Sequence, residues 1–270
     1  MTKKILFSMI ILICNLIFLK AQQSFKLADK EFDKGNYEKA IFYYTESINK
    51  KEELSTAYNY RGLSYLYLEK IQEAKADLES SFNLNPSDNK IHISFARFYA
   101  STGQFPKALE FYNSSIEKKP DDYQLYNERA GIKAVMEMYN EAIADADFSL
   151  KHLPNDYSAY LNRGYVYLRM GNYEKAINDL SASLKIKPSH KGFGNRGTAY
   201  ALSKKYDLAI NDFDRALTYN PDDVLVLYQK GEVLLTSGKR EKACDCFLKV
   251  KKLGNNEIDD VIEKAKCTSL

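Results

Sequence analysis

The sequence is poor in the residue types that carry chemistry. Its 270 residues include three histidines, four cysteines and no tryptophan. The histidines His92, His152 and His190 lie far apart, and the chain has no HExxH, phosphate-binding loop, nucleophile elbow or GxGxxG motif. Its many aspartates and glutamates fall on positions expected to face solvent. The sequence therefore predicts a protein that is not an enzyme, with no catalytic residue, no cofactor and no metal site.

Long apolar runs are also missing, apart from one at the start of the chain. Lys3 and Lys4 precede an apolar run over 5–19, which Lys20 and Ala21 follow. A charged start, a short apolar core and a small residue at the cut are typical of a secretory signal peptide. A spanning helix needs roughly 18–20 apolar residues. We therefore expect residues 1–21 to be cleaved and the protein to be exported, periplasmic or secreted; an uncleaved N-terminal anchor is the alternative.

The remaining chain lacks an excess of charge of either sign. Three of the 39 lysines and arginines lie within residues 1–21, which leaves 36 basic residues against 36 acidic ones. Nucleic acids and anionic membrane surfaces favour a strongly basic face. The sequence thus predicts neither as a partner, and no membrane insertion after cleavage.

A block ending in proline recurs through the chain. Its prolines are Pro86, Pro120, Pro154, Pro188 and, one residue short, Pro221. A fixed period of roughly 34 residues is typical of a stacked repeat protein, because one such unit cannot bury its own apolar face.

Each block carries the same internal positions. In the fifth block they are Tyr160, Arg163, Gly164, Tyr167, Gly171, Tyr173, Ala176, Leu180, Ser183 and Pro188. The first four follow the spacing of one helical face, and a glycine then marks the end of that helix. This pattern resembles the tetratricopeptide repeat. The resemblance implies an all-α, right-handed α-solenoid of about seven helical hairpins.

The seven repeats are expected to fill residues 22–255, with no linker between them. Their approximate bounds are 21–54, 55–88, 89–122, 123–156, 157–189, 190–223 and 224–255. Beyond them, Ile258, Val261, Ile262 and Ala265 again recur at helical spacing. We expect a capping helix and tail over 256–270 that covers the last repeat, and one elongated domain overall.

Four repeats carry arginine where the family usually has leucine. Each is followed sixteen residues later by an aspartate, in the pairs Arg61 and Asp77, Arg129 and Asp145, Arg163 and Asp179, and Arg196 and Asp212. Two other repeats are apolar at both positions, with Leu27 and Tyr43 or Phe95 and Phe111. In each of these repeats the two positions are either both charged or both apolar. We therefore expect the two side chains to be in contact and the charged pairs to be structural ion pairs. Arginines that reach for a ligand are the alternative.

Function is expected on the opposite face of each first helix. Positions 2, 6, 9 and 13 lie there, at about 100° per residue, and the resemblance implies that they line a concave groove. The predicted groove residues are Tyr60, Leu63, Tyr67, Lys90, Arg97, Glu128, Asn162, Tyr165, Arg169, Lys191 and Asn195. Tyrosine and arginine often anchor interfaces.

These positions predict a non-catalytic scaffold of the cell envelope that holds a peptide or protein partner in its groove. One alternative is a structural subunit of an envelope assembly that packs through its convex face or its ends. A weaker alternative is a groove that binds glycan or lipid.

Three cysteines remain beyond the signal segment. Cys244 takes a position that is isoleucine in other repeats, and Cys246 takes the aspartate position of the ion pairs, opposite Lys230. A bond from either one to Cys267 would staple the cap to the last repeat, but spacing alone does not fix the geometry. We expect three free thiols.

Overall fold

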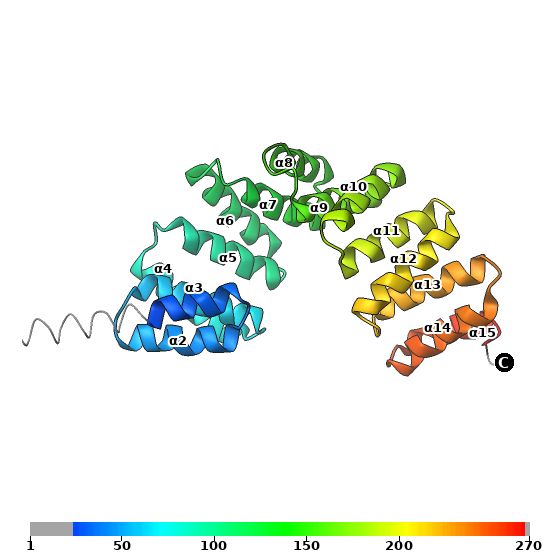
Figure 1. Ribbon diagram of the computed structural model, residues 1–270, viewed down its shortest axis with the longest axis horizontal. Coiled ribbons are helices and arrows are strands. Elements are labelled where there is room, and N and C mark those ends of the chain that lie inside the picture. Colours follow the sequence, from blue (N-terminus) through cyan, green and yellow to red (C-terminus); the bar gives the residue numbers. More distant parts are fainter. Residues whose placement is uncertain (1–23, 268–270) are drawn as a thin grey trace, which may run out of the picture. The chain divides into compact units, whose positions relative to one another are not determined.

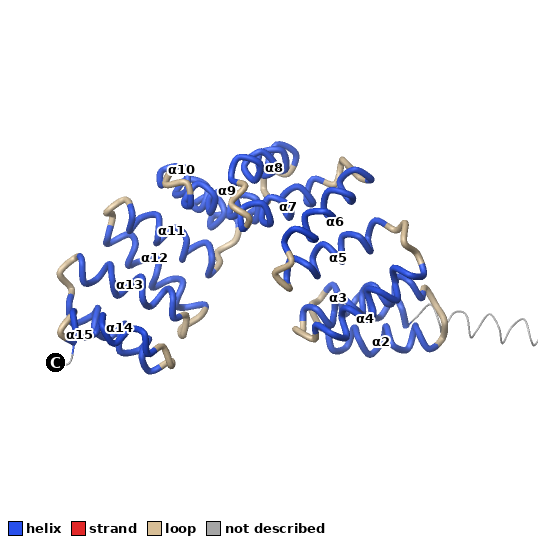
Figure 2. The backbone as a smooth tube through the Cα atoms, turned by 180° about the vertical axis from the view of Figure 1, so that it is seen from behind, coloured by secondary structure: helices blue, strands red, loops and turns tan. Residues whose placement is uncertain are grey.

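The computed structural model describes residues 24–267, and every regular element in that part of the chain is helical (Figure 1). Short loops join the helices (Figure 2). The predicted all-α repeat fold is therefore confirmed. The expected signal peptide lies outside the described residues.

The described part of the chain divides into two compact units, with the boundary between Pro120 and Asp121. The sequence predicts one continuous domain, and it does not mark this division because the turn at Pro120 has the composition of the other turns between hairpins.

Unit 1 is built from helical hairpins. Its described elements are a helix over 24–33, α2 (Tyr37–Asn49), α3 (Leu54–Tyr67), α4 (Ile71–Leu84), α5 (Asn89–Ser101) and α6 (Phe105–Lys118). Ala28, Ala40 and Tyr44 are fully buried where the first hairpin meets α3. Leu78 of α4 and Ile91 of α5 continue the core into the next hairpins.

Unit 2 continues the same pattern. It contains α7 (Tyr123–Val135), α8 (Tyr139–His152), α9 (Tyr157–Arg169), α10 (Tyr173–Ile186), α11 (His190–Leu202), α12 (Tyr206–Tyr219), α13 (Val224–Thr236), α14 (Arg240–Lys252), the 3-10 turn η1 (Asn256–Ile258) and α15 (Asp259–Lys264). Each odd-numbered helix from α7 to α13 packs against the helix that follows it.

Small residues at inward positions allow the helices of a hairpin to approach closely. A Cβ atom added to Gly197 of α11 would lie 2.8 Å from Cε1 of Phe213 on α12. One added to Gly164 of α9 would lie 2.8 Å from Cγ of Leu180 on α10. These positions therefore have no room for a side chain.

The structure brings all four arginines onto the aspartates sixteen residues later. Each arginine donates from Nε to Oδ2 at 2.7 Å and from Nη2 to Oδ1 at 2.7–2.9 Å. The aspartates are 3–8% exposed. Such two-pronged, charge-assisted contacts are among the stronger hydrogen bonds in proteins. In the repeat formed by α5 and α6, the rings of Phe95 and Phe111 stack instead, with centroids 5.3 Å apart.

Three of these arginines also link their hairpin to the hairpin before it. Nη1 of Arg61 donates to Oγ1 of Thr45 on α2 at 2.9 Å, and Nη1 of Arg196 donates to Oγ of Ser181 on α10 at 3.0 Å. Arg163 makes the corresponding ion pair with Asp147 on α8. The ion pairs therefore form part of the packing between stacked repeats.

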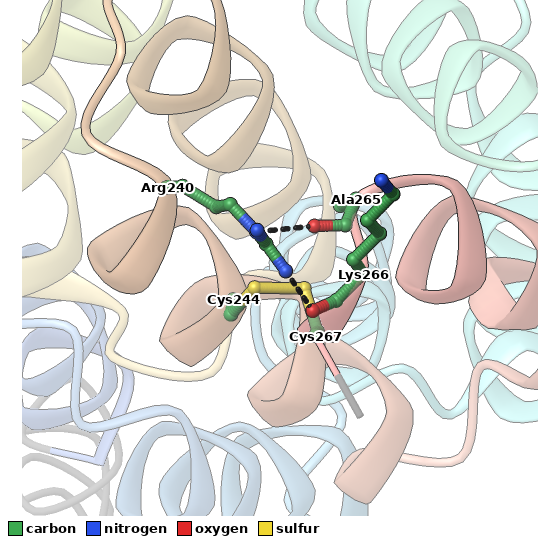
Figure 3. The surroundings of a disulfide bond; sticks show 5 residues. All are labelled: Arg240, Cys244, Ala265, Lys266 and Cys267. Atoms are coloured by element: carbon green, nitrogen blue, oxygen red, sulfur yellow. Dashed lines mark hydrogen bonds between the residues drawn. A yellow bond between two sulfur atoms is a disulfide. The ribbon is translucent and has the colours of Figure 1, made fainter. Parts of the chain in front are cut away.

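The C-terminal cap is covalently attached to the last hairpin. Cys244 of α14 and Cys267 form a disulfide (Figure 3), so the expectation of three free thiols is wrong. The chain turns back after α14 and brings Cys267 alongside that helix, a juxtaposition that spacing in the sequence does not reveal. Cys246 keeps a free, buried thiol, and burial raises its pKa.

Polar and apolar contacts also hold the cap in place. Ile258, Ile262 and Ala265 are buried in the same core as the disulfide. Nε of Arg240 donates to the carbonyl oxygen of Ala265 at 2.7 Å, and its guanidinium also reaches the carbonyl of Lys266 (Figure 3).

Candidate functional site

A cavity of about 620 Å³ opens on the first helices of three successive hairpins in unit 2, α9, α11 and α13. It is lined by Tyr165, Leu168, Arg169, Gly171, Tyr173, His190, Lys191, Gly194, Asn195, Thr198, Leu202, Asp223, Leu225, Val226 and Gln229. Its size is within the range of ligand-binding clefts.

Four predicted groove residues line this cavity together: Tyr165, Arg169, Lys191 and Asn195. Nη1 of Arg169 donates to the Tyr165 hydroxyl at 2.9 Å, and its Nη2 lies 3.2 Å from Oε1 of Glu137. The hydrogen bond with Tyr165 is the main cause of a raised pKa at Arg169. This arginine is therefore already engaged at one end of the cavity.

The cavity also contains residues that the sequence analysis did not select. Nε2 of His190 lies 3.1 Å from Oδ2 of Asp223, and Oδ1 of Asp223 accepts from the backbone N–H of Val226 at the start of α13. Leu225 and Gln229 occupy positions 2 and 6 of α13. The rule applied to the other repeats would have found these two residues if it had been extended to the last repeat.

Two further predicted groove residues of unit 2 lie outside this cavity lining. Nδ2 of Asn162 donates to Oδ1 of Asn127 on α7 at 2.8 Å and contacts its carbonyl oxygen at 3.3 Å. Asn162 thus links two successive first helices. Glu128 is half-buried on α7.

The structure places three predicted groove residues of unit 1 on α3 in different environments. The ring of Tyr60 packs against Phe32, with centroids 5.3 Å apart, and Tyr67 is 45% exposed. Leu63 is 2% exposed and belongs to the hydrophobic core with Leu78, so its prediction as a groove residue is wrong. Position 9 borders the packed face of the helix, and an apolar side chain there turns inward.

The remaining predicted groove residues, Lys90 and Arg97, lie on α5. Lys90 is exposed and Arg97 is half-buried. Lys90 acts electrostatically on Asp29 of the first helix, whose pKa is raised by burial despite a hydrogen bond from Tyr44 and the opposing charge of Lys90.

Within residues 24–267, no three His, Cys, Asp or Glu side chains gather in a way that would hold a metal ion. None of the helices in this part of the chain is both long and apolar enough to cross a bilayer.

Comparison with known proteins identifies the repeats. Family models described as tetratricopeptide repeat match residues 61–123, 157–190 and 191–223. No curated protein matches the chain.

Several solved structures share the fold. A crystal structure of the APC/C hetero-tetramer Cut9–Hcn1 aligns over 88% of this chain and 48% of that chain, at 20% identity and a TM-score of 0.81. A tetratricopeptide repeat protein from Parabacteroides merdae aligns over 93% and 99%, at 20% identity and a TM-score of 0.66. YrrB, described as a tetratricopeptide protein with an unusual peptide-binding site, aligns over 69% and 97%, at 20% identity and a TM-score of 0.53. The chain thus spans about half the length of the first of these proteins, and identities at this level show a shared fold.

Proposed function

Because the chain carries tetratricopeptide repeats in that family's fold, we propose that it is a non-catalytic scaffold that binds a peptide or protein partner across α9, α11 and α13. The observation that carries this proposal is the cavity on those helices, lined by the groove positions of three consecutive repeats. Stacked repeats commonly use such extended surfaces for binding.

The lining of the cavity suits a polypeptide ligand. Leu202 and Leu225 are 52% and 65% exposed, so a partner would remove apolar surface from water there. Asn195 and Gln229 offer amide groups to a peptide backbone. The unusual peptide-binding site of YrrB, which shares this fold, supports the same use of it.

We further propose that the scaffold works in the cell envelope, as an exported protein that begins at Gln22. The charged and apolar start of the sequence supports export. The disulfide between Cys244 and Cys267 supports it independently, since such bonds persist in oxidising compartments. An uncleaved N-terminal anchor is the alternative.

Exposed apolar residues on the second helices favour a second candidate function. Ile186 of α10 is 41% exposed, and Leu208 and Tyr219 of α12 are 50% and 53% exposed. A structural subunit of an envelope assembly would pack other subunits against such side chains.

Two matched double variants separate these functions in cross-linking capture from a cell-envelope extract. Asn195→Ala with Leu225→Ala alters the cavity, and Ile186→Ala with Tyr219→Ala alters the second helices. Both variants must first match the unmodified protein in helicity and melting temperature.

A partner that is lost only in the cavity variant supports the scaffold. A partner that is lost only in the other variant moves the function to the second helices. Equal capture by both variants and the unmodified protein contradicts both proposals.

A further inference from the structure

The contacts between successive hairpins recur at one pair of positions. A basic side chain on the first helix of a hairpin reaches a polar side chain on the second helix of the hairpin before it. These contacts join Arg61 to Thr45, Arg163 to Asp147, Arg196 to Ser181 and Lys230 to Asp214. We call the position on the second helix the acceptor position of its hairpin.

The last hairpin has a different kind of residue at its acceptor position. The six earlier hairpins all carry a polar residue there, namely Thr45, Glu79, Asn113, Asp147, Ser181 and Asp214. The seventh carries Leu248 of α14, which is 45% exposed. The described chain has no hairpin after α14, so none of its first helices meets this leucine.

The first hairpin departs from the pattern in the complementary way. Its residue at the arginine position is Leu27, and the described chain begins with this hairpin. Leu27 and Tyr43, the residue sixteen positions later, are both half-buried. The two ends of the solenoid thus match each other. An apolar side chain stands where an internal joint has arginine, and another stands where it has the acceptor.

The C-terminal cap limits access to the end of α14. Cys244 lies one turn before Leu248 on this helix, and its disulfide to Cys267 holds the cap against the helix (Figure 3). Ile258 and Ile262 of the cap are buried in the same core as Cys244. A helix as short as α15 has little stability of its own. The closed position of the cap therefore depends on these contacts and on the disulfide.

From the matching ends and the position of the cap, we infer that α14 is a stacking surface for the first hairpin of a second copy of this chain, and that the disulfide keeps the cap over it. Leu27 of the second copy packs against Leu248, in place of an arginine and its acceptor. Because unlike ends meet, the same joint can be repeated from copy to copy. The inference is separate from the cavity and takes from the proposed function only the start of the exported chain at Gln22.

Thiol–disulfide exchange uncovers the stacking surface. A dithiol reductant forms its own disulfide, and Cys244 and Cys267 each take up a hydrogen and become thiols. The cap is then free to leave the end of α14. We therefore expect the oxidised protein to be monomeric and the reduced protein to associate head to tail.

Sedimentation equilibrium of the purified protein that begins at Gln22 tests this inference. The weight-average mass is measured against concentration for the oxidised protein and in dithiothreitol, and thiol alkylation with mass spectrometry confirms complete reduction. The variant Cys244→Ala with Cys267→Ala lacks the bond without any reductant. The oxidised protein should remain a monomer. The other two should associate with dissociation constants on the order of 10–100 µM, as weak, transient interfaces do.

Matched variants test the contact between the two ends in the reduced state. Leu248→Asp should weaken association by at least about tenfold. Leu208→Asp makes the same change at a leucine of α12 that is 50% exposed, and it should have no effect. The variant Leu27→Arg with Tyr43→Asp copies the pair of the internal repeats and should also fail to associate alone. Mixed with the Leu248→Asp protein it should associate again, because every joint then pairs arginine with aspartate or leucine with leucine.

Equal association of the oxidised and reduced proteins would overturn the inference. So would a reduced protein that stays monomeric up to about 0.5 mM, or an equal effect of Leu248→Asp and Leu208→Asp. A mixture of the two folded end variants that fails to associate also rejects the contact between Leu27 and Leu248. If the variant with two substitutions in the first hairpin does not fold, the comparison of the two leucine variants still decides. None of these results depends on the capture experiment, so the scaffold function stands or fails separately.

Discussion

The ion pair between Arg163 and Asp179 gives the sharpest test of the packing between repeats. Two hydrogen bonds of 2.7 and 2.8 Å join the groups, and Asp179 is 8% exposed. The hydrogen bonding that Arg163 donates to Asp179 is the largest cause of the raised pKa of Arg163. Arg163→Leu removes the cation and leaves a nearly buried carboxylate without its main partner.

The expected loss in the free energy of unfolding is about 3 kcal/mol, because both groups are largely but not fully buried. For a unit of this size it corresponds to a fall of about 6–12 °C in melting temperature. The double variant Arg163→Phe with Asp179→Phe copies the stacked rings of Phe95 and Phe111 in the third repeat. We expect it to recover most of the loss, since replacing both partners of such a pair can be nearly neutral. Asp147 also loses its partner, but its side chain is 53% exposed and remains solvated.

Urea unfolding followed by circular dichroism gives the free energy of unfolding of the unmodified protein, Arg163→Leu and the double variant. Hydrogen exchange in α9 and α10 shows whether the loss of stability lies in this hairpin. Lys185→Leu, at an exposed position on α10, controls for the loss of a positive charge. The pairing argument is wrong if the double variant unfolds at the same urea concentration as Arg163→Leu or at a lower one. It is also wrong if Arg163→Leu behaves like the control.

Three further predictions concern other parts of the fold. Reducing the bond between Cys244 and Cys267, which are 23 residues apart, should lower stability by about 3 kcal/mol; melting with and without a reductant checks this, and Cys267→Ser should be insensitive to the reductant. Burial raises the pKa of Asp29, so the stability associated with its protonation is present below about pH 4 and is lost as the pH rises through the folded-state pKa. Asp29→Asn should therefore raise the urea midpoint at pH 7 but not at pH 3. Gly197→Ala should destabilise the protein by about 1–3 kcal/mol, because the added methyl group clashes with the partner helix. Gly194→Ala on the same helix should stabilise it by up to about 1 kcal/mol. Melting temperatures of the two variants that shift in the same direction would contradict this prediction.

The regular part of this fold could be predicted because each signal depends on helix geometry alone. The spacing of sixteen residues between Arg163 and Asp179 recurs in four repeats, and the contact it implies depends only on how two helices of fixed length pair. The prediction of Leu63 as a groove residue is wrong because position 9 lies at the border of the packed face, where helix geometry does not determine whether a side chain faces the core or the groove. There the side chain decides, and leucine joins the core.

The cavity and the disulfide depend on where separate segments meet. Leu225 comes next to α11 only when α13 stacks on it, and the rule for groove positions was not extended to the last repeat, where it would have selected this residue. The bond to Cys267 requires the chain to reverse after α14, and the residues 254–258 that achieve this follow no repeat pattern. Irregular segments therefore limit what periodicity can predict.

The disulfide lies where the series of ion pairs ends. The last repeat has Lys230 at the arginine position and the buried Cys246 at the aspartate position, and Lys230 pairs backward with Asp214 of α12 at 2.5 Å. No further hairpin follows α14 among the described residues, so its outer face cannot gain stability from a stacked neighbour. The short cap buries this face, and the disulfide and Arg240 hold the cap in place. A covalent bond thus takes the place of stacking at this end, which explains why reduction should destabilise the last hairpin more than the hairpins that retain arginine and aspartate.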